Sequence, residues 1–130
     1  MEYSGVENIN ERLEELKTED FIWIIYVAII FLSWIANSLE RKYFLFNDLM
    51  SKEKYREIMI IIFSILVIVY FYFYKESVSD INKLKDNDTD KKKILTIISS
   101  IASLLILISG IIFLIVAILD EDLDVELAFN

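Results

Sequence analysis

The stretch ILTIISSIASLLILISGIIFLIVAIL, residues 94–119, decides the fold class of this chain. It runs for 26 residues without a charged residue, a proline or a histidine, and 18 of its residues are Ile, Leu, Val or Phe. At about 1.5 Å per residue, a helix of this length covers roughly 39 Å, which exceeds the ~30 Å hydrocarbon core of a bilayer. The stretch therefore predicts a transmembrane helix.

Two further apolar segments, residues 21–39 and 58–74, predict two more transmembrane helices, because the charged residues collect in blocks between the segments. Only helices and closed barrels satisfy their backbone groups in lipid, and the alternating polarity of barrel strands is not found here. We therefore expect an all-α integral membrane protein with three transmembrane helices. The abundance of Ile, Lys, Asn and Asp favours an AT-rich bacterial source, and hence a bacterial cytoplasmic membrane.

The acidic N-terminal segment, residues 1–20, predicts a short amphipathic helix that is separate from the first span, which we expect Thr18 to cap. Apolar residues recur in this segment at spacings of three, four and three; they are Val6, Ile9, Leu13 and Leu16. This stripe predicts packing against the membrane-exposed loops of the same chain or, alternatively, binding of a protein partner or a second copy.

The connecting segments are predicted as an interfacial loop at 40–57, a charged loop at 75–93 and an acidic tail at 120–130, with Ser51 as the N-cap of a helical lead-in to the second span. The N-terminus and the second loop together carry eight Lys and Arg residues, whereas the first loop and the tail carry five. The positive-inside rule therefore predicts that the N-terminus lies inside and the C-terminus outside.

Small residues recur at intervals of seven along the third span and predict a helix-packing seam; they are Thr96, Ser103, Gly110 and Ala117. Small side chains let helix backbones approach closely in lipid, and a period of seven keeps the seam facing one partner. Either another helix of the same chain fills this seam, which yields a three-helix bundle, or a neighbouring copy fills it, which yields an oligomer.

Two polar groupings are candidates for a path through the membrane. Ser33, Asn37 and Glu40 share one face of the first span, where they either link helices by hydrogen bonds or line a hydrated path. The tail has no basic residue and carries Asp120, Glu121, Asp122 and Asp124. These carboxylates form a solubilising cap in a monomer, and in an oligomer they would form an acidic mouth that concentrates cations.

The residue inventory argues against catalysis and leaves two functional hypotheses. The chain has no cysteine, no histidine and only two glycines, so we expect no enzyme activity, no catalytic or cofactor-binding residues and no metal site. A net charge of −8 argues against nucleic acid as a partner, so the expected environment is the lipid bilayer. The first hypothesis is a membrane protein that acts through helix contacts as a homo-oligomeric pore or channel-like protein. The alternative is a non-catalytic accessory or scaffold subunit of a membrane complex.

Overall fold

The described residues of the computed structural model, 2–125 and 127, form three long helices joined by short turns. They are α1 (Glu2–Phe46), α2 (Leu49–Asn82) and α3 (Asp90–Leu119). Each helix contains a stretch long and apolar enough to cross a membrane, which confirms the predicted all-α fold with three candidate membrane spans. All three run past their apolar segments, since α1 measures roughly 68 Å, α2 roughly 51 Å and α3 roughly 45 Å.

The prediction of a separate N-terminal helix is wrong, because α1 continues without a break from Glu2 to Phe46. The Thr18 hydroxyl does not cap a new helix. It donates to the backbone oxygen of Glu14 at 3.2 Å, one turn earlier in the same helix. No proline or glycine lies between residues 6 and 46, so the backbone meets no residue that favours a break there. Residues 2–20 therefore extend the first apolar segment as one continuous helix.

Both connections are shorter than the predicted loops. Asn47 and Asp48 alone join α1 to α2, and Asn47 has a positive φ of 51°, which Asn tolerates better than most residues. The N-cap of α2 is Asp48 and not the predicted Ser51: the Asp48 carboxylate accepts from the Met50 N–H at 3.2 Å and from the Ser51 hydroxyl at 2.9 Å. Thr89 caps α3 by accepting from the Lys92 N–H.

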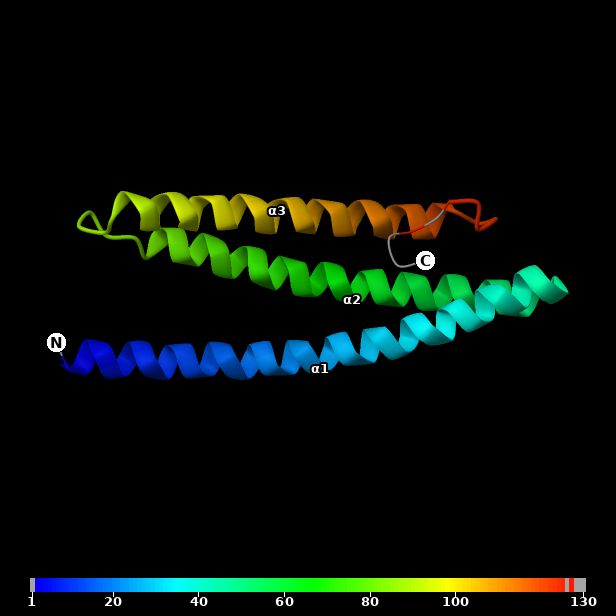
Figure 1. The fold of residues 1–130 in the computed structure, drawn as a ribbon, viewed down its shortest axis with the longest axis horizontal. Coiled ribbons are helices and arrows are strands. Elements are labelled where there is room, and N and C mark those ends of the chain that lie inside the picture. The colour runs from blue at the N-terminus through cyan, green and yellow to red at the C-terminus, as the bar shows by residue number, and fades with distance from the viewer. Residues whose placement is uncertain (1, 126, 128–130) are drawn as a thin grey trace.

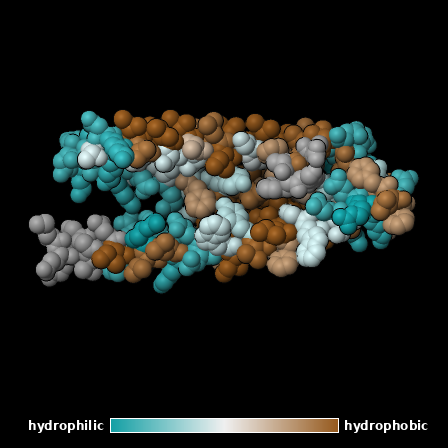
Figure 2. Space-filling view, in the orientation of Figure 1, coloured by the Kyte–Doolittle hydropathy of each residue, from teal (hydrophilic) through white to brown (hydrophobic). Residues whose placement is uncertain are grey.

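The three helices lie in one layer with α2 in the middle (Figure 1). In the described part of the chain, α2 packs against both α1 and α3, whereas α1 and α3 make no close backbone contact with each other. The core accordingly centres on α2, where the side chains of Met59, Ile62 and Phe63 are almost fully buried. Phe63 stacks on Phe113 of α3 with ring centroids 5.7 Å apart. Figure 2 shows hydrophobic side chains along the outer edge of α3, the surface expected of a helix in lipid.

Gly110 of α3 packs closely against α2. A Cβ atom at this position would lie 2.9 Å from Cδ2 of the Tyr70 ring and 3.5 Å from Val67. Both neighbours belong to α2, so another helix of the same chain covers the face of α3 at Gly110.

We predict that Gly110→Leu lowers the free energy of unfolding by about 1–3 kcal/mol, because the added side chain must displace the Tyr70 ring. The measurement is SDS-induced unfolding in bicelles. Ser109→Leu is the matched control, since Ser109 is exposed and its hydroxyl bonds only the backbone of its own helix. Equal stability of the two variants would contradict this packing.

Candidate binding cavity

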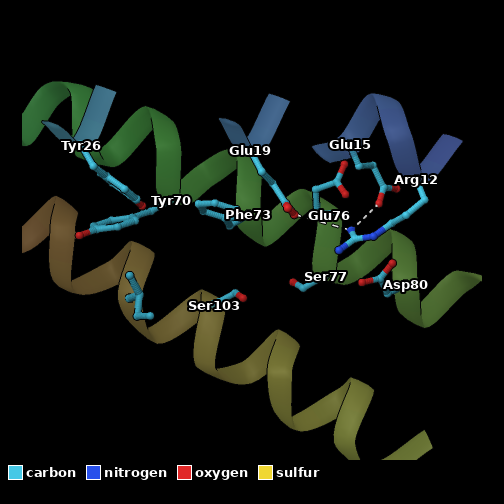
Figure 3. Close-up of a pocket in the computed structure, with 11 residues that line it drawn as sticks. Arg12, Glu15, Glu19, Tyr26, Tyr70, Phe73, Glu76, Ser77, Asp80 and Ser103 are labelled. Atoms are coloured by element: carbon cyan, nitrogen blue, oxygen red, sulfur yellow. Dashed lines mark hydrogen bonds and ion pairs between the residues drawn. The ribbon is translucent and has the colours of Figure 1, made fainter. Parts of the chain in front are cut away.

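A cavity of about 530 Å³ lies between the three helices, at the end where α1 begins and α2 meets α3. Residues of all three helices line it, as Figure 3 shows. We call it the wedge cavity. Its lining comprises Arg12, Glu15, Glu19 and Tyr26 of α1, Tyr70, Phe73, Glu76, Ser77 and Asp80 of α2, and Ser103 and Ile106 of α3.

Helical spacing brings these side chains onto common faces. On α1 the lining residues recur at intervals of three, four and seven, which places them on one side of the helix. On α2, Tyr70, Phe73, Ser77 and Asp80 recur at three, four and three. Two helix faces therefore point at each other, and α3 contributes Ser103 and Ile106 beside them.

The cavity has an aromatic end and an acidic end. Tyr26, Tyr70 and Phe73 lie together within the apolar segments, with their rings on the same side of the cavity (Figure 3). The carboxylates of Glu15, Glu19, Glu76 and Asp80 lie beyond the apolar segments, which begin at residue 21 of α1 and end at residue 74 of α2. The cavity thus extends from the apolar segments to the charged segments beside them.

Arg12 is the one cationic residue in the described lining, and it is already paired. Its Nη1 donates to Glu15 Oε2 at 3.0 Å and lies 3.7 Å from Glu19 Oε1. Lys83 lies outside the lining, where its ammonium donates to Glu11 at 2.7 Å and lies 3.9 Å from Glu15. The hydrogen bond to the Glu11 carboxylate raises the pKa of Lys83. Among the described residues, Glu76 and Asp80 have no ion pair within 4 Å.

The predicted seam residues lie toward α2. Gly110 and Ala117 are buried, while Thr96 and Ser103 are half-buried. The two hydroxyls bond within α3: Thr96 donates to the backbone oxygen of Lys92 and Ser103 to that of Ser99. Ser100 and Leu107 complete the buried side of the helix. Ser103 alone among the four predicted residues lines the wedge cavity.

The two predicted polar groupings lie elsewhere. Ser33 and Glu40 are half-buried and Asn37 is exposed. Glu40 lines a narrow cavity that it shares with Tyr55 and Arg56. The tail residue Asp120 accepts from the N–H groups of Asp124 and Val125 and so folds the chain back on itself. The tail residue Asp122 forms an ion pair with Lys52 of α2 at 3.6 Å. Leu127 is buried in the core, and Glu121 is exposed.

The N-terminal stripe points away from the bundle. The exposed fractions of Ile9, Leu13 and Leu16 are 61%, 52% and 39%, and the side chain of Val6 lies outside the described part of the structure. Because Arg12, Glu15 and Glu19 face the wedge cavity, the stripe occupies a different face of α1.

Sequence reasoning did not predict the wedge cavity, although a signal for it was present. Glu15 and Glu19, and likewise Glu76 and Asp80, are like charges four residues apart on a helix. Such pairs destabilise an isolated helix by roughly 0.2–0.5 kcal/mol. Both pairs adjoin the ends of apolar segments that two antiparallel helices would bring together, so their spacing was a signal for an acidic site shared between these helices.

Comparison with family models, with curated proteins and with solved structures finds no match to this chain. The assignment of a function therefore depends on the geometry of the described residues.

We predict that Arg12→Gln loosens the N-terminal part of α1, because Arg12 is the cation among the four lining carboxylates. Backbone amides of residues 9–19 should exchange with deuterium faster than in the unsubstituted protein, and the difference should shrink at high salt. Lys17→Gln is the control, since exposed Lys17 makes no ion pair with a described residue. Unchanged exchange in Arg12→Gln would refute the role of Arg12.

Proposed function

We propose that the protein is a non-catalytic accessory subunit of a membrane complex, which binds its partner through the N-terminal part of α1. The observation that supports this proposal is the exposed stripe of Ile9, Leu13 and Leu16. These residues precede the apolar segment that begins at residue 21, so lipid is not expected to cover them. The alternative is that the stripe packs against the rest of the same chain, but in that case these residues would be buried, and they are exposed.

The charges around the stripe define the partner that it fits. Glu14 and Asp20 border a shallow concavity beside Leu13 and Leu16, with Lys17 as the basic residue there. A helix that carries an apolar stripe flanked by Lys and Arg complements this surface. A second copy of the chain would instead bring like charges together, since residues 1–20 contain seven acidic and two basic residues. The proposed partner is therefore a different protein with a basic amphipathic helix.

The homo-oligomeric pore has less support as a second hypothesis. A pore of this kind requires a seam on α3 that is free to bind neighbouring copies, whereas Gly110 packs on Tyr70 of α2 in the same chain. The acidic tail would form the mouth of such a pore. Instead, Asp120 accepts hydrogen bonds from later residues of the tail, and Asp122 pairs with Lys52 of α2.

We predict that Leu13→Glu weakens partner binding by about 10- to 100-fold, the equivalent of losing one buried leucine contact. Binding is measured with the full chain in nanodiscs and a synthetic helical peptide with Leu at the a and d positions and Lys at e and g. A peptide with Glu at e and g should bind weakly. Leu45→Glu is the matched control, because Leu45 is also exposed on α1 but lies at its opposite end.

The same pair of variants also tests the native complex. A second membrane protein should co-purify in a fixed ratio with the unsubstituted chain and with Leu45→Glu, but not with Leu13→Glu. The proposal fails if neither peptide binds, or if a homo-oligomer that depends on Leu13 forms instead.

We further propose that the protein lies in a bacterial cytoplasmic membrane with its N-terminus inside and its C-terminus outside. The chain has no natural cysteine, so single cysteines report each side directly. A membrane-impermeant maleimide should label Asp124→Cys in intact cells and Lys85→Cys only after lysis; both positions are exposed. The reverse pattern would invert the topology.

A further inference from the structure

The wedge cavity has the dimensions and position of a ligand site. Its volume of about 530 Å³ lies within the roughly 300–1,000 Å³ that is typical of small-molecule sites. It opens where the apolar segments end, so a ligand can enter from the membrane surface with its apolar part leading. Interhelical cavities of this kind are common places for ligands in helix bundles.

The aromatic end is suited to an apolar body with a positive charge. Tyr26, Tyr70 and Phe73 present three rings to one space, as Figure 3 shows. Aromatic faces attract organic cations, and they provide large apolar contact areas. Ile106 of α3 adds a further apolar wall.

The acidic end carries more negative than positive charge, even with Lys83 beside it. Four carboxylates line the cavity with one guanidinium, and that guanidinium is engaged by Glu15 and Glu19. Glu76 and Asp80, on adjacent turns of α2, remain without an ion pair among the described residues. A cation held between them would offset the repulsion between these carboxylates.

We propose that the wedge cavity binds a lipophilic organic cation, with its charged centre near Glu76 and Asp80 and its apolar groups against Tyr26, Tyr70 and Phe73. A metal ion fits less well, because the described residues contain no group of three acidic side chains placed to hold one. A phospholipid fits less well because its phosphate would lie beside four carboxylates.

This site is independent of the proposed partner surface. Leu13 belongs to the exposed stripe and does not line the wedge cavity. Leu13→Glu should therefore bind the cation as tightly as the unsubstituted protein does. Cation binding and partner binding can thus be measured separately, and either proposal can fail while the other holds.

The test uses the full chain in phosphatidylcholine nanodiscs with radiolabelled tetraphenylphosphonium, and empty nanodiscs provide the background. We expect saturable binding above this background, and we expect Glu76→Gln with Asp80→Asn to raise the Kd at least about tenfold. Both substitutions remove like charges, so the helices should keep their packing. Glu53→Gln is the control, because Glu53 is an exposed carboxylate near the other end of α2 and should leave the Kd unchanged.

Tetraphenylborate has nearly the same shape with the opposite charge, and it should not bind above background. Phe73→Leu should weaken tetraphenylphosphonium binding several-fold while Glu53→Gln does not, since the rings contribute to holding a cation. The proposal is overturned if binding equals that of empty nanodiscs, if the double variant retains the original Kd, or if the borate binds equally well.

Discussion

The contact between Gly110 of α3 and the ring of Tyr70 on α2 links the packing of the bundle to its cavity. Because Gly110 has no side chain, the Tyr70 ring lies directly against the backbone of α3. The same ring lines the wedge cavity together with Tyr26 and Phe73. A larger residue at 110 would displace this ring, and would therefore alter both the packing of two helices and the wall of the cavity.

The continuity of α1 determines which of its faces meets the other helices. One uninterrupted helix carries Arg12, Glu15 and Glu19 on the face toward the wedge cavity, and Ile9, Leu13 and Leu16 on another face. A break near Thr18 would have allowed the first twenty residues to fold down onto the bundle and cover that stripe. Because the helix does not break, the first face meets α2 and the second remains exposed.

The middle position of α2 explains why a cavity forms at all. A single layer of three helices lets α2 bury residues on two sides, whereas α1 and α3 each have one neighbour. In the described part of the chain the outer helices make no close backbone contact, and at one end the space between the three helices is the wedge cavity. Carboxylates around this opening lie beyond the apolar segments, where water can solvate them.

The sequence by itself determined three helices long and apolar enough to cross a membrane, because a run such as residues 94–119 has no other way to satisfy its backbone in lipid. It also indicated which side of α3 carries small residues, but not whether α2 or a neighbouring copy would cover them. Only the tertiary structure decided that α2 covers Gly110, that α1 continues through Thr18, and that Glu15, Glu19, Glu76 and Asp80 share one cavity. The physical reason is that hydropathy and period are properties of each helix alone, whereas a cavity depends on how separate helices are positioned relative to one another.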